Sequence, residues 1–387
     1  MQVHLDESER AFQAAVRQFA REEVGPRAKA WDEGQEVEPE VSRAYARLGA
    51  PGLRIPQEYG GSPASFVMLG IAVEETARGD YGFAENAARP AIFGEFFNVA
   101  SPELCREWLP RIASLESIGL FALTEPGGGS DAAGIRTQAI RDGDDWVLTG
   151  EKASISNAGN ADVGLVFART GGAGARGISC FLVPMGLPGV SRQVYDSPGG
   201  RLVQRGSVTL DQVRVPAYNL VGEENQGFYQ AMRFFDYNRA MVALQALGVA
   251  QESIEETIAY VKGRHTFGRP LAKYEGISFQ LAEFLTMTEA ARLLCYQALS
   301  KKDRGEPCGK ETAMAKWFGT STAFQVIHGC LLLHGHYGYN KDLPFERRLR
   351  DVMGSETADG TIEIMKLIIA RETIGQEAVP YRIARSV

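Results

Sequence analysis

One aspartate near the end of the chain carries a side chain that could do chemistry. Asp359 lies in the segment Ala358–Thr361 and precedes an apolar run that includes Ile362, Leu367 and Ile369. Asp before such a run is typical of a helix N-cap, where the carboxylate accepts a hydrogen bond from a backbone amide. A carboxylate can also act as a general base when an acidic C–H lies within hydrogen-bond reach. The local pattern alone favours the cap.

A glycine-rich segment and two cationic positions could bind a phosphorylated ligand. The segment Phe121–Asp131 places three consecutive glycines among hydroxyl side chains, which lets backbone amides approach a phosphate or an electron-rich ring. Asp236 and Arg239 lie three residues apart on a predicted helix and therefore share a face. Arg264 carries a guanidinium, which can pair with two phosphate oxygens. Each pattern alone indicates only a turn or a solvent-exposed charge.

Two other patterns lack the context that their chemistry requires. Residues 172–177 match GxGxxG, but predicted strands flank them at Val163–Thr170 and Ile178–Val183, whereas a nicotinamide site needs a following helix. We therefore expect a hairpin loop there. His334-Gly335-His336 has no third histidine at a supporting spacing, so we expect a helix end or a subunit contact and no metal. The absence of GxSxG leaves a serine hydrolase unsupported.

The elements that must position these residues change twice along the chain. Helical spacing precedes residue 118, short β-rich runs follow it, and long helical periodicity resumes at Gly227. We expect a mainly α protein with an N-terminal helical domain at 1–118, a middle β-barrel or sandwich domain at 119–226, and a C-terminal four-helix bundle at 227–387. The predicted helices before the β domain span Glu7–Val24, Val41–Leu53, Phe66–Arg78 and Pro90–Leu109, and the further predicted strands span Thr137–Ile140, Trp146–Thr149 and Ser207–Val213.

The composition excludes several classes of protein. The 387 residues include 41 Lys and Arg against 48 Asp and Glu, a net charge of −7, which leaves no basic excess for a nucleic-acid backbone. The fractions of hydrophobic and charged residues, 44% and 23%, are those of a globular protein. Five cysteines without a CxxC pair indicate reduced thiols. Without a signal-peptide pattern or 18 consecutive apolar residues, we expect a cytoplasmic protein that does not insert into a membrane.

Five motifs, in order along nearly the whole chain, resemble those of the acyl-CoA dehydrogenase family. These are Leu123–Asp131, Gly150–Lys152 with Ile155–Asn157, Asp236–Arg239, Arg264–Pro270, and Asp359–Thr361 followed by Ile369–Glu372. The resemblance implies an FAD-dependent enzyme that dehydrogenates an acyl-CoA thioester. It also implies a homo-oligomer, expected to be a tetramer, and electron-transferring flavoprotein as electron acceptor.

The resemblance also assigns expected roles to individual residues. Asp359 matches the catalytic base, which is usually Glu in the family, and Ser130, Asp236, Arg239, Ala358 and Gly360 match the substrate site. FAD is expected to contact Phe121, Leu123, Thr124, Gly129, Ser130, Ser154, Ile155, Ser156, Arg264, Thr266, Phe267, Gly335, Thr361 and Glu363, with the group from Arg264 to Gly335 acting across a subunit boundary.

The identity of the base narrows the expected substrate. Some family members place the base on the helix that carries Asp236–Arg239, but the matching residue here is Asn238, which leaves Asp359 as the first candidate and Glu356, three residues earlier, as a reserve. Asp is shorter than Glu by one C–C bond, about 1.5 Å. Ala358 and Ser154 also stand where relatives carry bulky aromatic residues. These three residues resemble the branch that oxidises cyclohexane- and cyclohexene-carboxyl-CoA.

Three alternatives remain open from the sequence. The acyl group could be bound to a carrier protein. The chain could be a flavin oxidase similar to the nitroalkane oxidases, which also use Asp. A non-catalytic scaffold that binds FAD or acyl-CoA is the third alternative.

Overall fold

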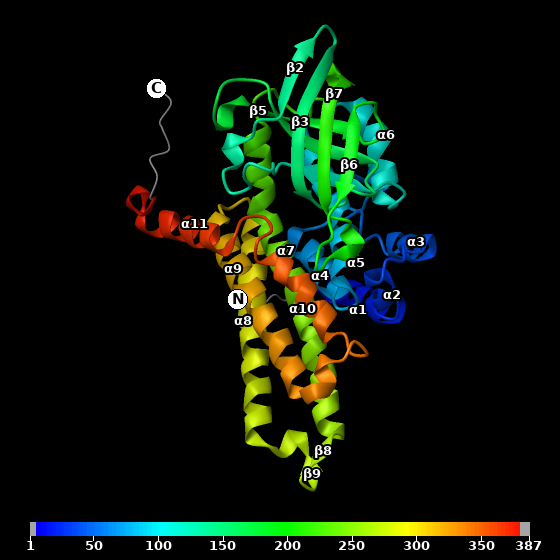
Figure 1. Ribbon diagram of the computed structural model, residues 1–387, viewed down its shortest axis with the longest axis vertical. Coiled ribbons are helices and arrows are strands. Elements are labelled where there is room, and N and C mark those ends of the chain that lie inside the picture. The colour runs from blue at the N-terminus through cyan, green and yellow to red at the C-terminus, as the bar shows by residue number, and fades with distance from the viewer. Residues whose placement is uncertain (1–4, 380–387) are drawn as a thin grey trace. The chain divides into compact units, whose positions relative to one another are not determined.

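The computed structural model describes residues 5–379, which divide into two compact units, 5–235 and 236–379. Figure 1 gives the order of the elements, and each unit is described by itself here. The helix α7 (Gly227–Gly263) begins in the first unit and continues in the second. No helix among the described residues is both long and apolar enough to cross a membrane.

Short polar side chains begin most helices of the first unit. Asp6 and Glu9 form a capping box at the start of α1, and Ser65, Asp80 and Ser101 cap the helices α4, α5 and α6. The helices are α1 (Glu7–Phe19), which continues as a π-helical turn at Ala20–Val24, α2 (Ala28–Asp32), α3 (Pro39–Arg47), α4 (Phe66–Ala77), α5 (Tyr81–Phe97) and α6 (Pro102–Ala113).

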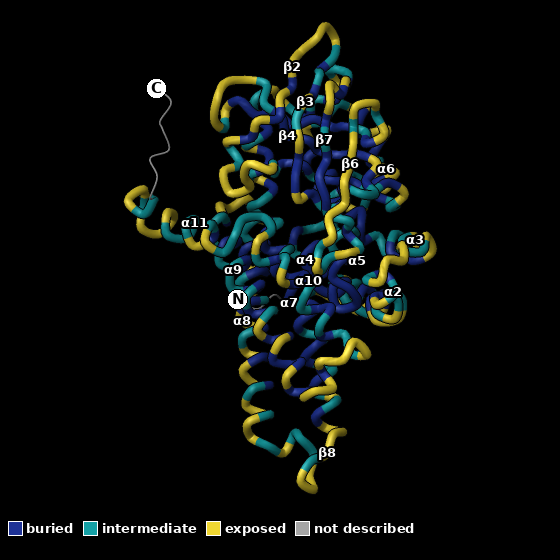
Figure 2. The backbone as a smooth tube through the Cα atoms, in the orientation of Figure 1, coloured by how far each residue is buried: buried dark blue, intermediate teal, exposed yellow. Residues whose placement is uncertain are grey.

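Seven strands of the first unit form one sheet. Their order is β1-β4-β2-β3-β7-β6, and β5 pairs with β4. The sheet is buried along its central strands, whereas β6 and the β2–β3 turn are exposed (Figure 2). The strands are β1 (Gly119–Ala122), β2 (Gln138–Asp142), β3 (Asp145–Ile155), β4 (Val163–Arg169), β5 (Ile178–Pro184), β6 (Val190–Val194) and β7 (Gly206–Pro216).

Most of the second unit is built around one central helix. α9 (Gly309–Leu333) packs against α8 (Glu275–Asp303), α10 (Phe345–Ser355) and α11 (Ile362–Ile374). It also approaches α7 closely, because a Cβ at Gly319 would lie only 2.8 Å from Ala243 Cβ. The short strands β8 (His265–Thr266) and β9 (Arg269–Pro270) form a hairpin after α7.

The predicted fold class is confirmed, while some predicted elements were wrong. The expected helix Pro90–Leu109 is two helices, because Ser101 caps a new helix with Pro102 in its first turn. The helix expected at Val41–Leu53 ends at Arg47. The strands β1 and β6 were not predicted, because β1 has only four residues and the five residues of β6 are mostly polar and exposed. The GxGxxG residues connect the antiparallel strands β4 and β5, as predicted. The predicted domain boundaries stay a prediction.

Candidate active site

The glycine-rich loop after β1 is anchored by the carboxylate of Glu125. Its Oε1 accepts hydrogen bonds from Lys152 Nζ at 2.8 Å and from the Thr137 backbone N–H at 2.9 Å. Its Oε2 accepts a hydrogen bond from the Arg136 N–H at 2.6 Å. Lys152, which is fully buried on β3, also donates to the carbonyl of Leu123 at 3.1 Å. The start of the predicted flavin loop is therefore fixed to β3 and to the two residues that precede β2.

Burial sets the electrostatics of this pair. It lowers the pKa of Lys152 to about 8, and the charge and hydrogen bond of Glu125 offset part of that effect. Burial also opposes ionisation of Glu125, but the charge of Lys152 and the hydrogen bonds outweigh it and lower the pKa of this carboxyl. Both groups are therefore charged at neutral pH.

Four hydroxyl groups near this loop are free to bind a ligand. The side chains of Thr124, Ser130, Ser154 and Ser156 make no hydrogen bond to any other residue in the described range 5–379, and all four are exposed or half-buried. A register shift interrupts β3 between Lys152 and Ile155, and Ser154 within it has a left-handed φ of 56°. Free hydroxyls beside exposed glycines fit the polar edge of a flavin, so these residues suit the predicted cofactor.

The apolar members of the predicted flavin set lie in or next to the core. Leu123 and Ile155 are buried. The ring of Phe121 is half-buried in an aromatic cluster, with its centroid 4.8 Å from those of Phe167 and Phe234. Phe121 therefore stabilises the end of β1, and Gly129 is exposed in the loop that follows.

The second unit holds the predicted base. The Oδ2 atom of Asp359 accepts a hydrogen bond from Asn238 Nδ2 at 2.5 Å, and its carbonyl accepts one from Arg239 Nε at 3.2 Å. Thr361 is the residue that caps α11, because its hydroxyl accepts a hydrogen bond from the Ile364 N–H at 3.3 Å. The cap that the local pattern favoured for Asp359 was therefore wrong. Asp359 instead has a left-handed φ of 53°.

The other predicted substrate residues of this unit surround Asp359. Arg239 is buried, which lowers its pKa against the opposing effect of the carboxylates of Asp359 and Asp236. Ala358 and Gly360 are the neighbours of Asp359 in the chain, and both are half-buried. Gly360 has a φ of 101°, and a Cβ there would lie 2.7 Å from the Met365 side chain. Glu363 is exposed on the first turn of α11.

The residues expected at the adenosine end of FAD lie at or near the β8–β9 hairpin. Arg264 is exposed, Thr266 is half-buried, and Phe267 has 94% of its surface exposed at the turn. The rings of Tyr260 and His334 stack with centroids 4.1 Å apart, which brings the end of α7 close to Gly335. His334 lies at the C-terminal end of α9, as predicted, and its Nδ1 bonds to the Cys330 carbonyl.

Sequence reasoning missed the role of three residues. The sequence identifies Asn238 only as a residue that cannot act as a base, yet its amide donates a hydrogen bond to the Asp359 carboxylate. Lys152 belongs to the motif Gly150–Lys152, but the sequence does not indicate that its ammonium group anchors the glycine-rich loop through Glu125 and Leu123. Lys316 went unnoticed on α9, although a Lys on one helix face with Ala313, Thr320 and Ala323 is the signal of a buried cation.

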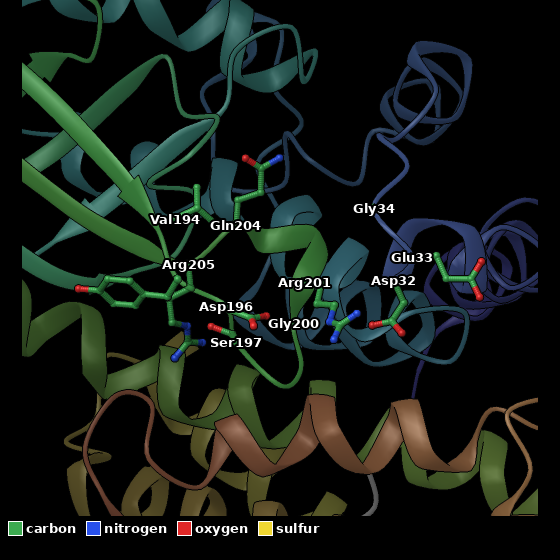
Figure 3. A pocket seen from close by; sticks show the side chains of 11 residues that line it. Asp32, Glu33, Gly34, Val194, Asp196, Ser197, Gly200, Arg201, Gln204 and Arg205 are labelled. Atoms are coloured by element: carbon green, nitrogen blue, oxygen red, sulfur yellow. The ribbon is translucent and has the colours of Figure 1, made fainter.

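A surface pocket of about 270 Å³ lies elsewhere in the first unit. Figure 3 shows that its lining comes from the end of α2 and from the segment that follows β6. The lining carries both charge signs, with Asp32 and Glu33 on one segment and Arg201 and Arg205 on the other. It contains none of the predicted site residues.

Comparisons with known proteins agree with these arrangements. Three family models match: "Acyl-CoA dehydrogenase, N-terminal domain" at residues 6–116, "middle domain" at 120–213 and "C-terminal domain" at 225–374. An acyl-CoA dehydrogenase of Bacillus subtilis is 36% identical over 96% of this chain and 100% of its own length. A cyclohexane-1-carbonyl-CoA dehydrogenase of Geobacter metallireducens is 37% identical over 97% and 100%.

Solved structures give the same result. A glutaryl-CoA dehydrogenase from Mycobacterium smegmatis, solved in complex with FADH2, superimposes with a TM-score of 0.90 at 31% identity, covering 96% of each chain. Sequence models, relatives and structure therefore agree over almost the whole length. The chain belongs to the acyl-CoA dehydrogenase family, whose members use FAD and act on a CH–CH bond of an acyl-CoA.

Proposed function

We propose that Asp359 is the base that removes the α-proton of the acyl-CoA thioester. The observation that carries this proposal is the environment of its carboxylate. The side chain accepts a hydrogen bond from Asn238, and Thr361 is the residue that caps α11, so the cap of this helix does not explain the carboxylate at position 359. A hydrogen-bonded carboxylate held on a fixed turn is suited to accept a proton from a positioned substrate.

When bound, FAD would supply the acceptor for a hydride from the β-carbon of the substrate. Leu123, Thr124, Ile155 and Ser156 would hold its ring system, with the unbonded hydroxyls of Thr124 and Ser156 as hydrogen-bonding groups. Further cofactor contacts would come from Gly129, Ser130, Ser154, Thr361 and Glu363. On the substrate side, Asp236 and Arg239 would bind the thioester and pantetheine part, and the buried Arg239 also orients the base through its carbonyl.

The acyl group that we propose is an alicyclic ring. Ala358 adds only a methyl group next to the base, and Ser154 leaves its position on β3 exposed. The shorter Asp side chain also keeps the proton acceptor about one C–C bond further back than a Glu would. A cyclohexane-1-carbonyl-CoA dehydrogenase is among the relatives of this chain, and the proposal extends its substrate class to this chain.

Anaerobic reduction of the flavin tests both parts of the proposal. The holoenzyme is mixed with cyclohexane-carboxyl-CoA, cyclohex-1-ene-carboxyl-CoA or butyryl-CoA, and the loss of flavin absorbance is followed. We expect the ring thioesters to reduce the flavin fastest, whereas preference for butyryl-CoA would contradict the ring. We also expect Asp359→Asn to reduce its flavin about 10²- to 10⁴-fold more slowly at unchanged FAD content.

The assembly that we propose is a cytoplasmic homotetramer with electron-transferring flavoprotein as the electron acceptor. Phe267 is placed to take part in the oligomer, because its ring, with 94% of its surface exposed at a hairpin turn, is open to contact with a second copy of the chain. Arg264, Thr266, Phe267 and Gly335 would contact FAD bound to a second copy of the chain.

A further inference from the structure

A fully buried lysine holds the turn that carries Asp359. Lys316 lies in the middle of α9, and its Nζ donates to the carbonyls of Glu356 and Gly360, both at 2.7 Å. No carboxylate within residues 5–379 comes within 4.0 Å of this ammonium group. A buried charge without a partner carboxylate costs stability, so packing alone does not account for a lysine here.

The two carbonyls lie on either side of Asp359. The turn between them contains two consecutive residues with positive φ, 53° at Asp359 and 101° at Gly360. A left-handed conformation is unfavourable for a residue with a side chain, although less so for Asp than for most, and hydrogen bonds from neighbouring groups help to hold it. Lys316 fixes both ends of this turn from α9, and Arg239 fixes the Asp359 carbonyl from α7.

We infer that Lys316 is a positioning residue for the base. Its two hydrogen bonds fix the turn 356–360, so that the Asp359 carboxylate keeps one direction through each turnover. Its positive charge stabilises the ionised carboxylate. This inference rests on the proposed role of Asp359 and explains how a short base is kept in place.

The charged groups around Lys316 agree with an electrostatic effect of this lysine on Asp359. Asp359 and Glu356 on the turn and Glu363 on α11 attract its charge, while Arg239 on α7 opposes it. Burial outweighs the attraction and lowers the pKa of Lys316 to about 8, which leaves the group protonated at neutral pH. Removal of Lys316 would leave Arg239 as the cation in contact with the Asp359 residue.

Three variants test the inference in the full holoenzyme. Lys316→Met keeps the length and volume of the side chain but removes both donors and the charge. Lys316→Gln keeps donor hydrogens without the charge. Ser321→Ala is the matched control, because Ser321 lies on the same helix and donates to the Glu356 side chain at 3.2 Å without contacting either carbonyl.

The readouts are FAD content, the dissociation constant of the thioester, and the rate of flavin reduction at saturating thioester as a function of pH. We expect Lys316→Met to reduce its flavin about 10- to 100-fold more slowly, since displacement by about an ångström has effects of this size. The thioester dissociation constant and FAD content should change less than about threefold, and the acidic limb of the rate profile should move to higher pH. Ser321→Ala should match the wild type.

The outcomes separate this inference from the proposed function. A Lys316→Met enzyme with the wild-type rate and pH profile, beside an inactive Asp359→Asn enzyme, would overturn the positioning role alone. Full turnover by Asp359→Asn would overturn the proposed base and the inference with it. If Lys316→Met does not fold, an unchanged pH profile in Lys316→Gln would also contradict the inference.

Discussion

The Asp359 carboxylate depends on a neutral amide for its orientation. Because a hydrogen bond to a charged group contributes about 1.5–3 kcal/mol, we expect its loss in Asn238→Ala to move the acidic limb of the rate profile upward by about 1–2 pH units. Asn238→Asp should move it further, since two adjacent carboxylates oppose each other's ionisation. Stopped-flow flavin reduction between pH 5 and 9 measures this, and an unchanged limb in both variants would contradict the role of Asn238.

Lys152 offers a second test at the residue scale, through the pH dependence of stability. The pKa of Lys152 is about 8 in the folded protein, whereas that of an unperturbed lysine is 10.5, so between these pH values the unfolded chain holds more protons. The contribution of Lys152 to the free energy of unfolding therefore increases as the pH rises from 8 to 10.5. In Lys152→Met the slope of unfolding free energy against pH should be lower by up to about 1.4 kcal/mol per unit. Urea denaturation at several pH values measures this slope, and equal slopes in Lys152→Met and the wild type would refute the prediction.

At the scale of elements, the close approach of α7 and α9 positions both groups that hold the base. A Cβ at Gly319 would lie 2.8 Å from Ala243 Cβ, so Gly319→Ala should separate the helices and cost about 1–3 kcal/mol of unfolding free energy. Gly354→Ala is the control, because nothing lies within 4 Å of its added Cβ and α10 should gain up to about 1 kcal/mol in helix propensity. Chemical denaturation compares them, and equal stabilities would argue against tight packing.

The elements also show what could be predicted from the sequence. Long helices and β-rich runs were predicted because their periodicity is local, and the order of motifs identified the family. The positions of Lys316 and Asn238 could not be predicted, because their partners lie 40 to 44 and 121 residues further along the chain. The cap predicted at Asp359 was wrong because Asp359 and Thr361, two residues apart, are both residue types that cap helices, and only the hydrogen bond from the Ile364 N–H to the Thr361 hydroxyl distinguishes them.

At the scale of the whole molecule, the proposed tetramer can be tested through the exposed hairpin. If Phe267 contacts FAD bound to a second copy, Phe267→Ser should weaken FAD binding at least several-fold and shift the assembly toward smaller species. Ile140→Ser is the control, since Ile140 is 62% exposed on β2. Light scattering with flavin titration measures both quantities. A Phe267→Ser protein with wild-type mass and FAD affinity would refute the subunit contact.

The two contacts from α7 to Asp359 come from consecutive residues, Asn238 and Arg239, one to the side chain and one to the backbone. A small rotation or translation of α7 would therefore displace the Asp359 carboxylate in the same direction. Substitutions on the buried side of α7, even several turns away, should alter the catalytic rate as well as the thermal stability. Selection for a new substrate could therefore reposition the Asp359 carboxylate through substitutions in α7, without replacing Asp359 itself.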